Sequence, residues 1–451
     1  MVDVIRELRH GARRLRRAPV FSFTTIVVLA LGIGATTSVF TLVDGILIRP
    51  LPFLHPERLV DLSHTVSVSG AHHINQSDAT YLLYQRHATA FTSVAAYRES
   101  AVTLGAIDGS AQDAERLPAT GITASLFKTL GVVPSMGRPF SEDEDRPNGA
   151  PVVIISSALW NRTFGADKHI VGKRVLIDGR SSEIVGVMPA DFHYPNTGIK
   201  LWMPLQLDPA HTRAGSFNYI GLGRLSPGVT ASGAAAELDR LSPRTLDEFP
   251  DYIPKAMWEQ AHLRAVITPL RDVMVGDVSH LLWILMGAVG LVLVIACANV
   301  ANLFLVRAEG RQRELAVRSA LGAAKSVIAA QLLAESAIVA TVGGVIGLGL
   351  AFLGVKALSA LPAGIDLPRL TEVGVDGEAL VFALGVTVLG ALIVSVVPLI
   401  RLRRITISAV LRESDRSATT GAARQRTRSA FVIVQVAMAL VLVASSGLMA
   451  R

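Results

Sequence analysis

Two short patterns in this 451-residue chain partly match motifs of nucleotide-binding loops and of catalytic serine sites. The segment GADKHIVGKR at 165–174 lacks the GxxxxGKS/T spacing that cradles phosphates in a P-loop. Ser125 and Lys128 form an SxxK pair, yet the SDN and KTG sequences that complete such sites are missing. We therefore expect neither a P-loop in this chain nor a catalytic serine at position 125, and the sequence predicts that the chain itself is not an enzyme.

Histidines, carboxylates and one cysteine are the other groups that could bind a metal. Five of the histidines lie in one stretch of the chain: His55, His64, His72, His73 and His87. A strand would point the adjacent His72 and His73 to opposite faces, and no carboxylate is spaced to join them. The run EDED at 142–145 lacks the oxygen spacing of a calcium loop and predicts a solvated turn. Because Cys297 is the sole cysteine, we expect no disulfide within the chain and no cysteine-based zinc site. The spacing of the histidines and carboxylates likewise predicts no metal site, and we expect no cofactor.

Polar and small residues also occur inside apolar segments. Asn299 and Asn302 are spaced i, i+3, which suits a hydrogen bond to a neighbouring membrane helix or a substrate path, and helix packing is the favoured interpretation. Four glycines in the next apolar segment predict a face on which helices approach closely: Gly343, Gly344, Gly347 and Gly349.

The charged segment RAEGRQRELAVRSALGAAKS, which starts at Arg307, connects two apolar segments. Its composition favours a helix, with a Glu314–Arg318 pair at i, i+4 and an end at Gly322-Ala323. A charged helix held between two membrane spans can bind a cytosolic partner and move both spans together. The alternative is a solvated connector without a partner.

Hydropathy predicts a membrane protein. Mean hydropathy is +0.46, with 51% hydrophobic and 18% charged residues, which argues against both an ordinary soluble enzyme and a disordered chain. Five segments are apolar and long enough to span a bilayer: residues 20–43, 281–305, 332–358, 378–400 and 430–450. The first is longer than a signal-peptide core and predicts an uncleaved anchor. Glu335 and Lys356 lie near the two ends of the third segment, where we expect both side chains to reach the interface.

Lysine and arginine predict the orientation of these spans. Residues 1–19, 306–327 and 401–429 together contain 19 Lys and Arg against six Asp and Glu, whereas residues 44–280 contain 21 against 25. Cytoplasmic segments carry the positive excess, so the three basic segments are expected in the cytoplasm together with the N-terminus. Residues 44–280 and the loop 359–377 are then outside.

The N-terminal segment combines six arginines with apolar residues at helical spacing, namely Ile5, Leu8, Ala12 and Leu15. This pattern predicts a short amphipathic helix lying on the lipids of the inner leaflet. Simple anchoring by positive charge explains the arginines equally well.

Residues 44–280 mix strand and helix signals, which predicts an α+β domain of about two parts. Ser77 and Thr230 precede helical patterns and are expected to cap them. The sequence VLIDGRSSEIVGVMP predicts a hairpin that turns at Asp178-Gly179. Further strands are expected at AVTLGAI, ERLPAT, PVVIIS, LWMPL, NYIGLGRL and HLRAVITPL, with a helix over ALWNRTFG.

The connector and the outer domain together resemble the FtsX/MacB-type permeases of ABC transporters. The segment NVANLFLVRAEGRQRELAVRSALGAAKSVIAAQLLAES is similar to their coupling segment. The sequences LFKTLGVVPSMGRPFSEDED and SSALWNRTFGADKHIVGKRVLIDGRSSEIVGVMPADFHYP, followed by LWMPL, are similar to the MacB-type periplasmic core. The likeness covers nearly the whole chain and is nearest to the duplicated orphan permeases of acidobacteria.

The resemblance implies a membrane α-helical fold of about five spans, four of them one FtsX-type unit, with a large α+β extracytoplasmic domain of MacB-type periplasmic-core architecture. The implied parts are a cytoplasmic basic segment (1–19), a first span (20–43), the periplasmic core domain (44–280), a second span (281–305), a cytoplasmic coupling helix (306–327), a third span (332–358), an outer loop (359–377), a fourth span (378–400), a cytoplasmic linker (401–429) and a fifth span (430–450). The coupling residues carried over are Arg307, Arg311, Arg313, Glu314, Arg318, Gly322 and Ala323.

The resemblance also implies a function and partners. A separate cytosolic ABC ATPase would hydrolyse ATP, and the coupling helix would pass its motion to a periplasmic domain that handles substrate for export across the bacterial inner membrane. The alternative is FtsX-like signalling, in which the outer domain activates an envelope hydrolase or acts as a sensor. The expected partners are the ATPase, a second permease half or second copy, membrane lipids and, for export, a periplasmic adaptor and an outer-membrane channel, but no nucleic acid.

Residues 427–451 resemble the start of the second half of the duplicated relatives. Because the chain ends there, we expect a truncated product or a fragment. Self-association or a separate second half would then replace pairing of two halves within one chain.

Overall fold

The computed structural model describes residues 4–66, 71–105, 114–250, 253–310, 325–359, 369, 373–402, 433 and 436–437. The chain divides into two compact units. The first, here named the helical unit, comprises residues 1–48 and 278–451, and the second, named the sheet domain, comprises residues 49–277. Each is described by itself.

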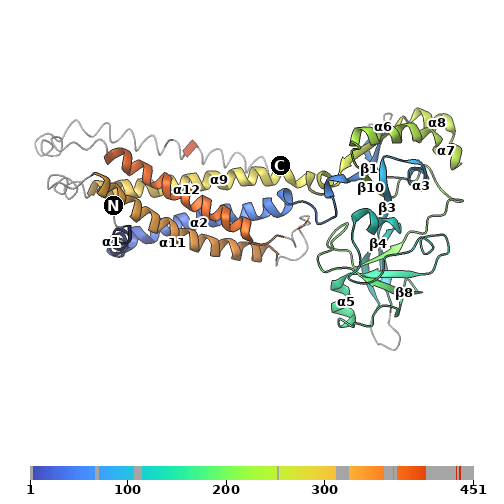
Figure 1. Cartoon of the computed structure of the whole chain (residues 1–451), viewed down its shortest axis with the longest axis horizontal. Coiled ribbons are helices and arrows are strands. Elements are labelled where there is room, and N and C mark those ends of the chain that lie inside the picture. Colours follow the sequence, from blue (N-terminus) through green and yellow to red (C-terminus); the bar gives the residue numbers. More distant parts are fainter. Residues whose placement is uncertain are drawn as a thin grey trace, which may run out of the picture. The chain divides into compact units, whose positions relative to one another are not determined.

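The helical unit is built from long apolar helices (Figure 1). Its elements are α1 (Val4–Arg16), α2 (Pro19–Val43), the π-helical turn η1 (Asp44–Ile48), α9 (Leu270–Gly310), α11 (Lys325–Ser359) and α12 (Gly377–Leu402). Four stretches are long and apolar enough to cross a membrane: Pro19–Ile48, Val278–Arg307, Ala330–Leu358 and Gly377–Ser395. They coincide with the first four predicted spans, whereas nearly all of the fifth, 430–450, lies outside the described residues.

Glycines bring α2 and α11 together. A Cβ built on Gly34 would lie 2.9 Å from the carbonyl oxygen of Gly347, closer than side chains normally approach a backbone. The predicted small-residue face is confirmed for Gly343, Gly344 and Gly347, each of which has a neighbouring helix within contact distance. It is wrong for Gly349, which is exposed and faces open space. Two residues correspond to about 200° around a helix, so Gly349 points away from the face that Gly347 shares.

One buried apolar cluster joins all four long helices. It contains Leu29 and Ile33 of α2, Val300 and Phe304 of α9, Val339 of α11, and Val386 and Val394 of α12. In lipid, such contacts stabilise by close packing, since the apolar surroundings provide no hydrophobic driving force between helices. Phe40 and Phe382 also stack with their ring centroids 3.9 Å apart.

The sheet domain contains eleven strands and eight short helical segments among its described residues. The strands are β1 (Leu59–Val66), β2 (Ala71–Ile74), β3 (Phe91–Leu104), β4 (Glu115–Ile122), β5 (Met136–Gly137), β6 (Val152–Ile155), β7 (Arg174–Ile177), β8 (Arg180–Val187), β9 (Leu201–Pro204), β10 (Ile220–Leu225) and β11 (Leu263–Pro269). The helical segments are η2 (Pro56–Arg58), α3 (Asp78–His87), α4 (Ser125–Leu130), α5 (Ser157–Phe164), α6 (Ala231–Leu241), η3 (Ser242–Arg244), α7 (Thr245–Glu248) and α8 (Lys255–Gln260).

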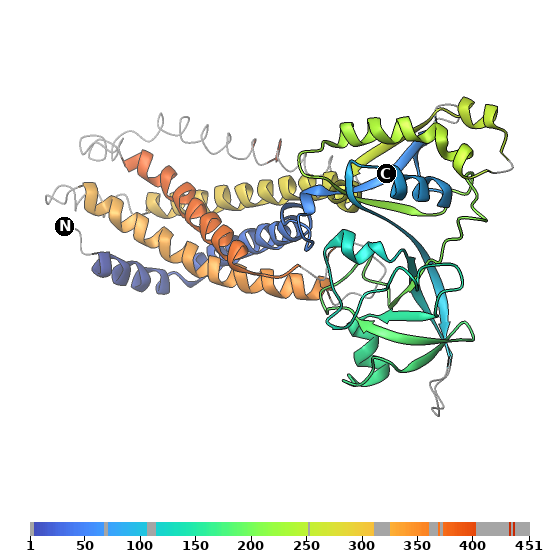
Figure 2. The same cartoon turned by 45° about the vertical axis from the view of Figure 1, so that its right-hand side comes forward.

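The strands form one mixed sheet in the order β11-β1-β10-β3-β4-β9-β6-β8-β5, with β2 beside β1 and β7 beside β3 and β8. The pairs β4–β9 and β6–β8 are parallel. The 14-residue strand β3 pairs with β10 through residues 91–97 and with β4 through residues 97–104. This strand therefore runs through two lobes of the domain. Lobe A contains β1, β10 and β11 with α3 and α6–α8, and lobe B contains β4 and β6–β9 with α5 (Figure 2).

Each lobe has its own apolar core, and a third cluster lies between them. Tyr84 and Leu238 belong to the core of lobe A, and Ile184 belongs to that of lobe B. The third cluster gathers Phe127 of α4, Trp202 of β9, Leu222 of β10 and Leu270 at the start of α9. The two lobes are thus held together by packing as well as by the shared strand.

The local sequence signals of this domain are confirmed. Ser77 caps α3 by accepting a hydrogen bond from the backbone of Thr80, and Thr230 caps α6. The hairpin β7–β8 turns at Asp178 and Gly179, both with positive φ. The expected strands appear as β3, β4, β6, β9, β10 and β11, and the helix over ALWNRTFG appears as α5.

Candidate coupling site

Of the predicted coupling helix, 306–327, the structure describes residues 306–310 and 325–327. Arg307, in the last turn of α9, is described and half-buried. The other predicted coupling residues lie outside the described residues: Arg311, Arg313, Glu314, Arg318, Gly322 and Ala323. What the structure shows is how the end of α9 and the beginning of α11 are held.

The N-terminal helix α1 packs on α11. A Cβ built on Gly11 would lie 3.1 Å from Ile338 Cδ1, so the absence of a side chain there allows the close contact. Of the predicted apolar face, Leu15 is buried against protein, whereas Leu8 and Ala12 are exposed. The amphipathic helix is therefore present, and protein covers Gly11 and Leu15 on it while Leu8 and Ala12 stay exposed.

An ion pair crosses the same contact. Arg14 Nη1 lies 3.4 Å from Glu335 Oε1, and the Glu335 side chain is 2% exposed. The expectation that Glu335 reaches the interface is wrong, because α1 covers this carboxylate. Burying an unpaired charge costs free energy, so a carboxylate buried at this position needs a nearby cation, and Arg14 supplies it.

Arg307 ties the end of α9 to the same helix. Its Nη2 donates a hydrogen bond of 3.1 Å to the carbonyl oxygen of Arg14. Its guanidinium also lies 4.4 Å from the centre of the Phe21 ring, which in turn packs edge-on against Phe304 at 5.1 Å. A cation over an aromatic face is stabilised by about 0.5–2 kcal/mol, more when water is excluded. We name these five residues, Arg14, Phe21, Phe304, Arg307 and Glu335, the Arg14 cluster.

The two asparagines of α9 lie away from the groove of the helical unit. Asn299 is exposed and Asn302 is half-buried. An apolar groove of about 450 Å³ lies between α11 and α12 and includes neither asparagine. Ser336 and Ser395, which do line it, share a hydrogen bond of 2.5 Å that joins the two helices.

The histidines of the sheet domain are dispersed. His64 is completely buried, with Nε2 at 2.8 Å from the Tyr84 hydroxyl, and burial lowers the pKa of this histidine to about 4. His55, His73 and His87 lie near three different carboxylates, those of Glu57, Asp61 and Glu248. Within the described ranges, no three His, Cys, Asp or Glu residues are placed to hold a metal ion.

The acidic run at 142–145 is only partly solvated. Glu144 is buried and both of its carboxylate oxygens accept hydrogen bonds from Arg138, at 2.6 and 2.9 Å. Asp145 accepts from the backbone N–H groups of Ala124 and Gln206, and burial raises its pKa. The prediction of a solvated turn is wrong for these two residues, because they fasten the loop to the segments on either side.

The serine of the SxxK pair is part of the local fold of α4. Ser125 Oγ donates a hydrogen bond of 2.8 Å to the carbonyl oxygen of Val94 and lies 3.0 Å from Thr123 Oγ1. Its proton therefore joins α4 to β3. In the segment 165–174, Gly165 ends α5 in the left-handed conformation and Lys173 pairs with Asp167 at 2.5 Å.

Two family models match the chain. The MacB-like periplasmic core domain matches residues 22–241, and the FtsX-like permease C-terminal model matches residues 286–407. The predicted resemblance to this kind of permease is confirmed, and the narrower likeness to the duplicated acidobacterial proteins stays a prediction.

Curated relatives match a similar portion of the chain. The macrolide export ATP-binding/permease protein MacB of Burkholderia cenocepacia is 28% identical over 248 residues, which cover 52% of this chain and 33% of that protein. The probable syringafactin export ATP-binding/permease protein SyfD of Pseudomonas syringae pv. tomato is 27% identical over 243 residues, covering 51% and 33%. The chain thus spans about a third of the length of these relatives. Among solved structures, the periplasmic region of MacB from Actinobacillus actinomycetemcomitans is 15% identical and covers 52% of this chain and 95% of that one. Its TM-score is 0.34, and we base no conclusion on so low a score.

Proposed function

The chain belongs to the MacB/FtsX-type permeases of ABC transporters, and we propose that it is the membrane subunit of an export system powered by a separate cytosolic ATPase. It has four apolar helices of spanning length and the α+β domain of such a permease. In this proposal, motion of the ATPase enters at residues 311–324 on the cytoplasmic side of the inner membrane. It reaches the sheet domain, which handles substrate outside the membrane.

The observation that carries the proposal is that both ends of the connector are fastened to one helix. Arg307, at the start of the connector, donates a hydrogen bond to the carbonyl oxygen of Arg14, and Glu335, soon after its end, pairs with the guanidinium of Arg14. A hydrogen bond to a charged group contributes about 1.5–3 kcal/mol. A force applied to the connector therefore acts on α1, α9 and α11 together instead of bending one helix alone.

The length of α9 supports transmission over a distance. It is a helix of 41 residues from Leu270 to Gly310, which corresponds to about 60 Å at 1.5 Å per residue. Leu270, at its first position, is 4% exposed and belongs to the apolar cluster between the lobes of the sheet domain. One continuous hydrogen-bonded segment thus leads from the connector to a buried position in that domain.

The partner is tested by co-purification of the tagged full chain from its native membrane. An ATPase of the ABC class should be recovered, and the charge reversals Glu314→Lys and Arg318→Glu should each reduce the amount recovered. Arg16→Gln, at an exposed position of α1, is the control that removes a charge without touching the connector. If no ATPase is recovered, or if the reversals behave like the control, the coupling assignment is wrong.

Transmission is tested separately with the ATPase bound. Because Cys297 is buried, a dye will react at an introduced Lys168→Cys on the exposed surface of the sheet domain. ATP should change the emission of this dye in the otherwise unaltered chain and in Arg16→Gln. In Glu335→Gln, which keeps the shape of the side chain, the ATPase should stay bound while the change in emission is lost. An equal response in Glu335→Gln would refute the role of the Arg14 cluster.

Orientation is tested by labelling intact cells. A cysteine introduced at Gln312 should be protected from a reagent that does not cross the inner membrane, and Lys168→Cys should react. The reverse pattern would overturn the proposal. In the alternative, FtsX-like signalling, the same ATPase and the same motion operate and no solute leaves the cell.

A further inference from the structure

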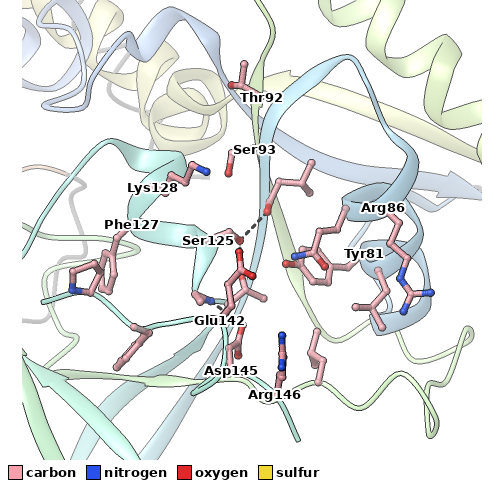
Figure 3. Close-up of a pocket in the computed structure, with 18 of the residues that line it drawn as sticks. Tyr81, Arg86, Thr92, Ser93, Ser125, Phe127, Lys128, Glu142, Asp145 and Arg146 are labelled. Carbon is pink, nitrogen blue, oxygen red and sulfur yellow. Dashed lines mark hydrogen bonds between the residues drawn. The ribbon is translucent and has the colours of Figure 1, made fainter. Parts of the chain in front are cut away.

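The sheet domain contains a cleft of about 910 Å³ at the meeting point of its two lobes. Its walls come from α3, the start of β3, the segment 123–133 around α4, and the loops 139–147 and 207–209. Figure 3 shows these segments converging around the open space. A cleft of 300–1,000 Å³ is the usual size for a small ligand, and a boundary between lobes is a usual place for one.

A buried hydroxyl without a partner lies at this cleft. Tyr81 is 2% exposed, and its hydroxyl makes no direct hydrogen bond to any described residue. In Figure 3 the hydroxyl end of Tyr81 points toward the centre of the cleft. The hydroxyls of Thr123 and Ser125 lie near it, and each makes another hydrogen bond: Thr123 Oγ1 accepts from the backbone of Ala96, and Ser125 Oγ donates to the carbonyl oxygen of Val94. An unsatisfied buried hydroxyl costs about 1–3 kcal/mol, which an acceptor on a ligand would recover.

Two side chains of opposite charge also line the cleft without neutralising each other. Lys128 and Glu142 are both exposed, and neither makes an ion pair or a side-chain hydrogen bond in the part of the chain that the structure describes. The other charged lining residues have partners. Arg86 pairs with Glu248, Arg146 pairs with Asp143, and Asp145 accepts two backbone N–H groups.

The remaining wall combines apolar residues with uncharged polar ones. Phe127 of α4 is fully buried behind it, and Leu82, Val132, Phe140 and Leu207 complete it. A ligand that matches this surface has an apolar body, a hydrogen-bond acceptor for Tyr81, an anionic group for Lys128 and a cationic group for Glu142.

We propose that this cleft is a binding site for an amphipathic zwitterion of the size of a short peptide. The ammonium group of the ligand pairs with Glu142, its carboxylate pairs with Lys128, and an internal carbonyl oxygen accepts from Tyr81. Apolar side chains of the ligand pack on the Phe127 wall. The proposal concerns binding alone, so its outcome is independent of the ATPase and of transport.

The test is calorimetric titration of the full chain in lipid nanodiscs with trileucine in three forms: unmodified, N-acetylated and C-amidated. The unmodified peptide should bind saturably. Each cap removes one charge and should weaken binding by about twofold to fivefold, the range for a solvent-exposed ion pair. The penalty of N-acetylation should vanish in Glu142→Gln, and that of C-amidation should vanish in Lys128→Gln, because the partner of the removed charge is then absent.

Two further variants separate binding from folding. Lys168→Gln removes an exposed lysine of lobe B outside the cleft and should bind all three peptides as the unaltered chain does. Tyr81→Phe should weaken all three by a similar factor without lowering the melting temperature, since it deletes a hydroxyl that has no partner. The proposal is overturned if unmodified trileucine shows no saturable heat, if the capped forms bind as tightly, or if the penalties persist in the matched variants.

Discussion

Acidification should destabilise the sheet domain through His64. This side chain is completely buried in β1, with Nε2 at 2.8 Å from the Tyr84 hydroxyl and Nδ1 at 3.4 Å from the carbonyl oxygen of Asn75. Burial opposes the charged form and lowers the pKa of His64 from 6.5 to about 4, although the carbonyl of Asn75 acts weakly in the other direction. Burial raises the pKa of Tyr84, so that neighbour stays neutral throughout the acidic range.

The sign and size of the effect follow from proton linkage. A histidine whose pKa is lowered on folding binds a proton less readily in the folded state than in the unfolded state. The stability that His64 contributes to the folded domain is complete above pH 6.5 and is lost as the pH falls toward 4. Each pH unit in that window corresponds to about 1.4 kcal/mol, so the free energy of unfolding should fall by about 3 kcal/mol across it.

The measurement is urea unfolding of the full chain in detergent between pH 7.5 and 4.5, followed by tryptophan fluorescence. Three of the four tryptophans, Trp160, Trp202 and Trp258, lie in the sheet domain and report on it. The variant His64→Gln cannot titrate and should lose about 2–3 kcal/mol less than the unaltered chain over this range. Parallel pH dependences of the two proteins would show that His64 is not held neutral by burial.

Two other predictions concern pairs that hold each unit together. Arg138 lowers the pKa of Glu144, so Glu144→Gln should cost about 1 kcal/mol near pH 7 and progressively less as the pH falls below 4.5, measured by urea unfolding extended below pH 4.5. Gly347→Leu should force α2 and α11 apart and destabilise the helical unit by about 1–3 kcal/mol. Gly349→Leu, on the exposed side of the same helix, should melt like the unaltered protein, and equal effects of the two would contradict the close contact.

The elements that sequence predicts correctly are those whose information is local. The hairpin at Asp178-Gly179 needs two residues that accept positive φ, and the caps Ser77 and Thr230 need one hydroxyl each. Apolar length alone is sufficient to predict the four spans. The order of the strands in the sheet cannot be read from any short segment of the sequence. Nothing in the sequence of β1 states that it lies between β10 and β11, because that arrangement depends on packing between distant segments.

Apart from Gly349, the errors concern polar residues whose burial depends on a distant partner. Glu335 was expected at the interface because it stands near the end of a span, and only the position of α1 reveals that it is covered. Asp145 belongs to a run of acidic residues that looks solvated, and its two backbone partners come from segments about 20 and 60 residues away. A usable signal existed for Glu335, since a carboxylate inside an apolar segment requires a cation and α1 offers several.

The arginines of α1 have two roles: they orient the helix at the membrane, and one of them pairs with Glu335. Orientation depends on the number of positive charges near the span, so Arg9, Arg13 and Arg16, which are exposed, satisfy it at any nearby position. The pair with Glu335 depends on the position of one charge, because among the α1 arginines whose side chains are described (9, 13, 14 and 16) it is Arg14 that contacts α11. Counting charges therefore predicts which side of the membrane α1 occupies and says nothing about the pair. For this reason Arg16→Gln should leave the ATP-dependent change in dye emission intact and Glu335→Gln should abolish it, although each substitution removes one charge.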